Sequence, residues 1–201
     1  MVSIVQGSDG KVRCGWCSAA PEFIAYHDQE WGYPVADDQR LFEKLCLESF
    51  QSGLSWRTIY AKRDNFRAAF AGFDFNTVAD YTSHDVERLL ADSGIVRHRG
   101  KIEAVINNAC RARELVAQEG SLARYFWSYE SVTEVGLEAQ SRSYSSQSKA
   151  LAKDLKKRGW KFVGPTTVYA FMQAMGLIND HTPECWMHGV IDHARSSFTR
   201  P

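Results

Sequence analysis

The sequence lacks the long apolar stretches that a membrane-spanning protein needs. Nowhere among its 201 residues do about 18 apolar residues follow one another, which excludes a transmembrane helix. The first eleven residues also lack a basic segment followed by an apolar run, so we expect no secretory signal. These two absences predict a cytoplasmic protein.

Net charge is also missing, because 24 Lys and Arg residues balance 24 Asp and Glu residues. Neutrality counts against a simple nucleic-acid binder, which usually carries a strong basic charge. The charge is unevenly spread, however. Residues 149–161 hold six basic residues against one acidic residue, and residues 97–101 form a second basic cluster. These clusters are either solvated helix faces or two parts of one basic surface.

The number of cysteines does not suit a disulfide framework. There are five, at positions 14, 17, 46, 110 and 185. An odd number without a secretory signal favours core residues, metal ligands or catalytic thiols.

Repeats, low-complexity tracts and clean strands with a period of two are absent, and helical periodicity dominates the sequence. We expect helices over 37–51, 56–70 (one or two short helices), 83–91, 98–117, 146–158 and 167–175, with a surface loop over 131–146. The turn at Asp92–Gly94 is expected to use a left-handed glycine. The sequence therefore predicts an all-α protein in one domain over 1–201, with a core over about 12–186 and flexible termini at 1–11 and 187–201.

Four residues near the two ends of the chain have the chemistry of a metal site. Cys14 and His27 lie near the start, and His181 and Cys185 lie near the end. Two thiolates and two imidazoles suit tetrahedral Zn²⁺ and fill its coordination sphere, which would give a structural site joining the N- and C-terminal segments. The spacing is equally consistent with buried core cysteines and surface histidines.

Two further residues offer alternatives to that ligand set. Cys17 forms a CxxC with Cys14 and could supply a second sulfur or a redox pair, although the redox interpretation needs a βαβ context that is not visible. His193 is a spare ligand in the C-terminal tail.

Glu48 lies at the edge of an apolar helix stripe formed by Leu41 and Leu45. A carboxylate there must reach solvent or find partners, because burying a bare charge is costly. The surrounding sequence is rich in aromatic residues, namely Trp16, Phe23, Tyr26, Trp31 and Trp56. Aromatic planes around a carboxylate suit a flat cationic heterocycle, although the same rings could equally fill the core.

Residues 86–109 read as a helix, a tight turn and a second helix that starts among basic residues. The free N–H groups of a helix N-terminus could bind a DNA phosphate without reading sequence. An ordinary αα-hairpin has the same pattern.

Taken together, these pieces resemble the 3-methyladenine DNA glycosylase I family of the helix-hairpin-helix DNA glycosylase superfamily. The resemblance covers roughly residues 12–186 and is carried by Arg13–Trp16, Ala25–Gly32, Leu47–Glu48, Gln51–Trp56, Gly94–Ile102, Lys156–Gly164 and Asn179–His181. It implies a helix-hairpin-helix DNA glycosylase-like fold. It also implies that the protein hydrolyses the N-glycosidic bond of 3-methyladenine in double-stranded alkylated DNA, releasing the base without lyase activity.

The resemblance also implies roles for individual residues. Glu48 and Tyr26 are assigned to catalysis, with Glu48 hydrogen-bonding the base and Tyr26 and Trp56 sandwiching it, while Trp16, Phe23 and Trp31 complete the pocket. The implied zinc ligands of one structural ion are Cys14, His27, His181 and Cys185. The implied DNA contacts are Gln51, Gly53, Leu54, Gly94, Arg97 and Lys101, with Leu54 filling the gap left by the flipped nucleotide.

This sequence departs from the family pattern at a few positions. Phe23 stands where some members have tyrosine, Ser49-Phe50 replaces a small or polar pair, Trp160 replaces a phenylalanine, and Cys17 should be a free thiol. A monomer associated with the nucleoid through DNA is expected. A lesion sensor that does not cut, a zinc hydrolase and a CxxC oxidoreductase are the competing functional hypotheses.

Overall fold

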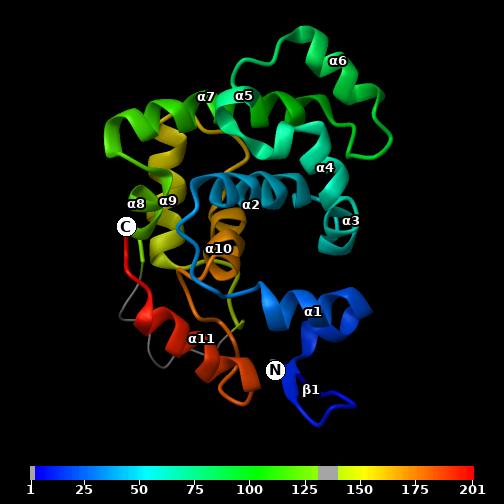
Figure 1. Cartoon of the computed structure of the whole chain (residues 1–201), viewed down its shortest axis with the longest axis vertical. Coiled ribbons are helices and arrows are strands. Elements are labelled where there is room, and N and C mark those ends of the chain that lie inside the picture. Colours follow the sequence, from blue (N-terminus) through cyan, green and yellow to red (C-terminus); the bar gives the residue numbers. More distant parts are fainter. Residues whose placement is uncertain (1–2, 131–139) are drawn as a thin grey trace.

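The computed structural model describes residues 3–130 and 140–201, and most of these residues are helical (Figure 1). The helices are α1 (Pro21–Gln29), α2 (Asp38–Gln51), α3 (Trp56–Tyr60), α4 (Arg63–Ala69), α5 (Phe75–Val78), α6 (Ser83–Ala91), α7 (Arg99–Glu119), α8 (Leu122–Trp127), α9 (Ser146–Lys157), α10 (Pro165–Ala174) and α11 (Trp186–Ser197), with 3-10 helices η1 (Gly15–Ala19) and η2 (Ala71–Phe73). Most of the predicted surface loop, 131–139, lies outside the described residues.

Helix α2 lies at the centre of the fold, with α7 on one side and α10 crossing it on the other (Figure 1). The Asp37 side chain caps it by accepting a hydrogen bond from the backbone N–H of Arg40 at 2.8 Å. All ten residues from 41 to 50 are buried. The prediction of a helix over 37–51 is confirmed, and burial extends beyond the predicted apolar stripe to the whole circumference of the helix.

The all-α prediction needs one correction, at the N-terminus. Strand β1 (Ile4–Gln6) pairs antiparallel with β2 (Val12–Cys14), so that part of the segment predicted to be flexible, 1–11, forms a hairpin. Strands of three residues are too short to show a period of two in the sequence. The hairpin delivers Cys14 to the interior.

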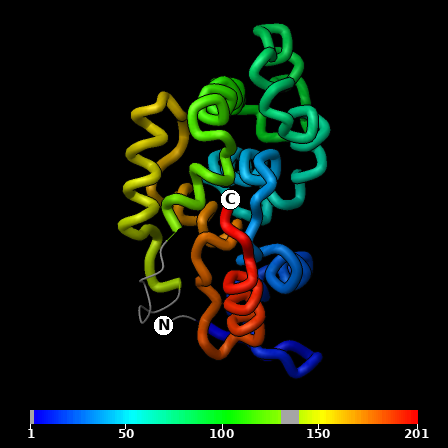
Figure 2. The backbone as a smooth tube through the Cα atoms, turned by 60° about the vertical axis from the view of Figure 1, so that its left-hand side comes forward, coloured from blue at the N-terminus to red at the C-terminus, as the bar shows by residue number. Residues whose placement is uncertain are grey.

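The C-terminal residues also differ from the prediction of a flexible tail over 187–201. They form helix α11, in which Met187 and Ile191 are fully buried. Arg195 and Arg200 pair with Glu130 at 2.7 and 2.9 Å. Helices α1 and α11, from opposite ends of the chain, lie at the same end of the molecule (Figure 2).

The turn after α6 is built differently from the prediction. Gly94 is not in the left-handed region; instead the Asp92 carboxylate accepts the Gly94 N–H at 2.7 Å and ends the helix. Predicted helices over 56–70, 83–91, 98–117 and 146–158 match α3 and α4, α6, α7 and α9. Helix α10 starts slightly earlier than predicted, at Pro165. No helix within the described ranges has the length and apolar character that crossing a membrane requires.

Candidate active site

A cavity of about 270 Å³ lies between α1, α2, α3 and α10. Its lining brings together six of the residues singled out in the sequence, and it adds four more: the lining is Trp16, Tyr26, Trp31, Glu48, Gln51, Trp56, Gln140, Arg142, Ala170 and Gln173. The volume is near the lower end of the range for ligand cavities, about 300–1,000 Å³. An aromatic cavity of this size suits a single flat ring system.

Glu48 is only 6% exposed, and its charge is balanced by a lysine that the sequence analysis missed. The Nζ atom of Lys44, one helical turn earlier, lies 2.7 Å from Glu48 Oε1. Lys44 also donates a hydrogen bond to the Tyr26 hydroxyl at 2.7 Å and lies 3.6 Å from the centre of the Trp56 ring. The i, i+4 spacing of Lys44 and Glu48 was the available signal.

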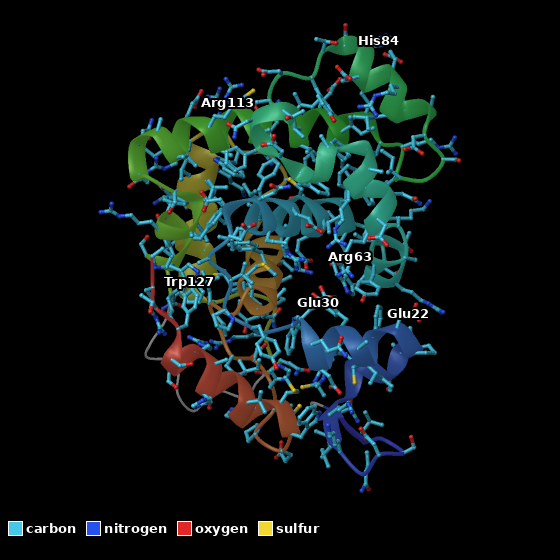
Figure 3. The ribbon with its side chains drawn as sticks, viewed as in Figure 1. Glu22, Glu30, Arg63, His84, Arg113 and Trp127 are labelled. Carbon is cyan, nitrogen blue, oxygen red and sulfur yellow. The ribbon has the colours of Figure 1, made fainter. Side chains whose placement is uncertain are left out.

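The surroundings of Lys44 are those of a buried cation. Burial lowers the pKa of Lys44, and the negative charge of Glu48 opposes that change. A second ion pair closes this region, because Arg63 of α4 and Glu30, the residue that follows α1, point toward one another, with 2.7 Å between Nη1 and Oε2 (Figure 3). Lys44 thus makes the contacts that were predicted for a cationic base. Its ammonium contacts Glu48, Tyr26 and Trp56.

The predicted sandwich of Tyr26 and Trp56 around a base does not match this conformation. The two ring centroids are 5.6 Å apart and the planes are inclined by 40°. A base between them needs two ring contacts of about 3.5 Å each, or about 7 Å in all. The Trp56 Nε1–H is buried and has no acceptor among the described residues. The cavity therefore lies beside these rings, and a base could enter between them only if the two rings moved apart.

Phe23 does not line the cavity, contrary to its predicted role in base binding. It is buried behind Trp16, with 6.2 Å between the two ring centroids, and also packs on Tyr60. Cys17 lies in the same small cluster, and burial raises the pKa of its thiol to about 11. A buried, protonated thiol of this kind is inert, which argues against the redox interpretation of the CxxC.

The wall opposite Glu48 consists of polar residues that had no signal in the sequence. Asp180 fixes them: it accepts hydrogen bonds from the Gln140 N–H at 3.0 Å and from Gln173 Nε2 at 2.5 Å. Arg142 donates to the Tyr169 hydroxyl at 3.3 Å. Gln140 and Arg142 belong to the segment predicted only as a surface loop, whose approach to α10 depends on the tertiary fold.

The four residues predicted as metal ligands do come together. The donor atoms of Cys14, His27, His181 and Cys185 all lie within 4.8 Å of one another, and all four residues are buried. The Sγ atom of Cys185 is 3.5 Å from both His27 Nε2 and His181 Nδ1, and Cys14 Sγ is 3.7 Å from His181 Nδ1. This cluster can hold a metal ion. Neither Cys17 nor His193 belongs to it.

The other nitrogen of each histidine is held by a neighbouring group. His27 Nδ1 is 2.7 Å from an Asp28 oxygen, and His181 Nε2 is 3.2 Å from the Trp31 carbonyl. Such contacts orient histidine ligands. The cluster also supports the cavity. The ring centroids of His27 and Trp16 are 5.5 Å apart, and those of His181 and Trp31 are 4.6 Å apart.

The predicted DNA contacts fall into two groups. Leu54 is 42% exposed on the loop after α2, where Gly53 has a φ of +77°, and Arg97 is exposed on the turn before α7. Gly94, in contrast, uses its N–H for Asp92 and its carbonyl for Lys62 and Asn65. Its N–H is therefore not available to a phosphate in this conformation.

Lys101 also differs from its predicted role. It is 7% exposed and donates hydrogen bonds to the carbonyls of Phe50 at 2.8 Å and Ser52 at 2.5 Å. It therefore satisfies the C-terminal end of α2 and ties the turn between α6 and α7 to the loop that carries Leu54. In this conformation the Lys101 ammonium is occupied by these carbonyls and does not face a phosphate-binding surface.

The fold is helical, and its cavity has aromatic walls and a buried carboxylate. These features define a class of helical proteins whose cavity fits a flat polar ring. The family model for methyladenine glycosylase matches residues 16–188. The chain belongs to the methyladenine glycosylase family.

Individual relatives agree with this assignment. DNA-3-methyladenine glycosylase 1 of Escherichia coli K12 is 51% identical over 178 residues, covering 86% of this chain and 95% of the relative. The DNA-3-methyladenine glycosylase of Haemophilus influenzae is 42% identical over 177 residues, with 86% and 96% covered. The crystal structure of a 3-methyladenine DNA glycosylase I has a TM-score of 0.79 at 46% identity, covering 88% of this chain and 99% of that one. Another solved 3-methyladenine DNA glycosylase I, a variant in complex with 3-methyladenine, has a TM-score of 0.81 at 35% identity, with 87% and 96% covered.

The buried pair of Lys44 and Glu48 predicts strong coupling between two substitutions. Lys44→Met or Glu48→Gln alone leaves one buried charge without its partner, and each should lower the free energy of unfolding by about 3–5 kcal/mol. The double variant should lose much less than the sum of the two. Urea unfolding of all four proteins measures this, and additive losses would contradict the pairing.

Lys101→Met should destabilise the protein by removing the donor to two buried carbonyls. We expect a loss of about 1–3 kcal/mol in the free energy of unfolding, measured by urea denaturation. Lys153→Met, an exposed lysine on α9, is the matched control and should change it little. Equal stability of the two variants would show that Lys101 does not hold the loop.

Proposed function

We propose that the protein is a DNA-3-methyladenine glycosylase, a hydrolase that removes 3-methyladenine from alkylated DNA in base-excision repair. The observation that carries this proposal is the buried carboxylate of Glu48 at the wall of an aromatic cavity, in a chain 51% identical to a named DNA-3-methyladenine glycosylase. The complex of a relative with 3-methyladenine supports the same ligand.

Methylation at N3 makes adenine cationic and weakens its bond to the sugar. In the proposed reaction the bond from C1′ to the base breaks, water bonds to C1′ and releases a proton, and the neutral base departs. Because the leaving group is already activated, the site needs no strong general acid. With Glu48 Oε1 held by Lys44, we assign Oε2 to the amino edge of the base.

Lys44 changes how the site would select its base. The pair it forms with Glu48 carries no net charge, so the carboxylate attracts a cation less than an unpaired carboxylate would. We therefore assign selectivity chiefly to the weakened bond of the lesion and to hydrogen bonding within the cavity. Normal adenine lacks that weakened bond.

The proposed substrate is duplex DNA, bound by a monomer through a helix-hairpin-helix formed by α6 and α7. Leu54 is an exposed apolar residue beside Gln51 of the cavity wall, which suits it to fill the gap left by an extruded nucleotide. Arg97 and the N-terminus of α7 would hold the phosphates. We further propose that it acts in the cytoplasm, associated with the nucleoid through its DNA substrate.

We further propose that the Cys/His cluster binds one zinc ion. Zinc bond lengths of about 2.0–2.3 Å in a tetrahedron put ligand atoms about 3.3–3.8 Å apart, and three donor pairs in the cluster lie 3.5–3.7 Å apart. Four protein ligands leave no position for water or substrate, so the ion would supply structural stability. Its role is to hold His27 and His181 behind the tryptophans of the cavity.

Release of free 3-methyladenine from methylated duplex DNA tests the function directly. We expect the wild-type protein to release this base, identified by chromatography, and to leave abasic sites without strand cleavage. Glu48→Gln should slow release roughly 10- to 150-fold, because a charge-assisted hydrogen bond worth about 1.5–3 kcal/mol is lost.

Two controls separate chemistry from stability in that assay. Glu114→Gln, on the exposed side of α7, should release base at the wild-type rate. The double variant Lys44→Met/Glu48→Gln removes both buried charges and should remain slow although its fold is restored. Binding of alkylated DNA without base release would point instead to a lesion sensor.

Elemental analysis of the purified protein tests the metal. We expect one zinc per chain, and Cys185→Ser should lose both the zinc and several degrees of thermal stability. Cys17→Ala, which removes the other thiol of the CxxC, should keep the zinc. Zinc-free native protein, or zinc lost from Cys17→Ala, would contradict the proposed ligand set.

A further inference from the structure

The loop between α9 and α10 holds an aromatic residue in an unfavourable conformation. Phe162 has a φ of +56° and is 40% exposed. A bulky side chain in the left-handed region is a genuine outlier. Burial of the ring cannot account for it, because the ring projects into solvent.

Hydrogen bonds from two other helices hold this conformation in place. Buried Asn108 of α7 accepts from the Lys161 N–H at 2.8 Å and donates to its carbonyl at 3.0 Å. Buried Ser49 of α2 donates to the Phe162 carbonyl at 3.1 Å. The residues on either side, Trp160 and Val163, are both buried and anchor the loop. The loop therefore cannot relax by turning Phe162 inward.

The position of the ring relates it to the proposed DNA-binding face. Its centroid is 6.4 Å from that of His98, the residue that caps the N-terminus of α7. Ser49, which holds the Phe162 carbonyl, adjoins Glu48 of the cavity. Lys101, near the start of α7, holds the loop that carries Leu54. The backbone of Phe162 is thus fixed to the same end of α2 as the hairpin and the Leu54 loop.

The charges nearby suit a nucleic acid. Lys161 precedes Phe162 and is exposed, and Arg97 precedes His98 and is exposed. Arg99 is held by Glu87 at 2.7 Å, so we do not count it among the available cations. An aromatic ring between cations is a common arrangement for contact with DNA, because the ring stacks on a base or sugar while the cations hold phosphates.

We propose that Phe162 is a further DNA-contacting residue, whose ring packs against a nucleotide flanking the extruded one. The inference rests on the proposed function. The strained backbone is then explained by the need to present the ring outward at a fixed angle, since strain persists where surrounding structure enforces it for binding. Leu54 and Phe162 would contact the duplex from two different loops.

Phe162→Gly separates this role from a structural one, because the two roles predict opposite effects on stability. Glycine accepts the positive φ without strain, so the melting temperature should stay the same or rise. Affinity for a duplex containing an abasic-site analogue, measured by fluorescence anisotropy, should fall roughly 5- to 140-fold, as expected when one stacking contact is lost. Affinity for free 3-methyladenine should not change, because Phe162 does not line the cavity.

Two further variants complete the test. Phe162→Tyr keeps a ring and should retain duplex affinity near the wild-type value. Val190→Ala removes another exposed apolar side chain, on α11, away from the α6–α7 hairpin. This variant should leave the duplex affinity and the melting temperature unchanged.

The outcomes are distinguishable from those that test the function. If wild-type protein releases 3-methyladenine and Phe162→Gly binds the duplex equally well, the inference is overturned and the function stands. A fall in both melting temperature and free-base affinity in Phe162→Gly would assign the ring a structural role and also overturn the inference. A wild-type protein that binds no duplex would overturn the proposed function and this inference with it.

Discussion

The burial of α2 on all sides is the constraint on which the rest of the structure depends. Ten consecutive buried residues include three with charged side chains, Glu43, Lys44 and Glu48. Because a buried charge needs a partner, Glu43 pairs with Arg67 at 2.8 Å and Glu48 pairs with Lys44 at 2.7 Å. A helix that would otherwise be ordinary core thus presents a carboxylate at the aromatic cavity. The same constraint accounts for the Lys101 contacts, since the carbonyls at the end of a buried helix also need donors.

The cavity and the Cys/His cluster form one continuous structure rather than two separate sites. The cluster joins segments 154 residues or more apart in the chain (His27 to His181), and its histidine rings contact Trp16 and Trp31 of the cavity wall. Arg13, which adjoins Cys14, binds Asp28 at 2.7 Å, and Asp28 in turn orients His27. A metal ion in the cluster would therefore stabilise the aromatic wall without touching the base. This is expected of a structural site, in which four protein ligands fill the coordination sphere.

The sequence contains most of the site but not its internal arrangement. Residue type and spacing marked Glu48, its aromatic neighbours and the four ligand residues as candidates, and the family resemblance assigned their roles. Lys44 was missed because a lysine at i−4 from a glutamate normally lies on a solvated face, and only the enclosure of α2 buries it as the partner of Glu48. Lys101 was assigned to DNA because the family resemblance implied it, and the sequence does not show that its side chain is buried. Gln140 and Arg142 could not be predicted, because their place opposite Glu48 depends on Asp180, 40 residues from Gln140 in the chain. The short helix α8 and strand β1 carry too few residues for periodicity to reveal them.

Tyr26 and Trp56 are in direct contact, with 5.6 Å between their ring centroids. This contact links recognition of the base to recognition of the duplex. Trp56 is the first residue of α3 and follows the Leu54 loop by a single residue, Ser55, whose side chain caps that helix. The loop is anchored on its other side by Lys101 at the carbonyl of Ser52. A shift of Leu54 into a duplex must be absorbed within Gly53–Ser55 or passed to Trp56, and the Trp56 indole N–H has no acceptor in the closed state to resist it. Insertion into DNA and opening of the cavity would then be movements of one short segment. The site would then be completed when damaged DNA is engaged, and Lys44 would hold Glu48 Oε1 until the base arrives.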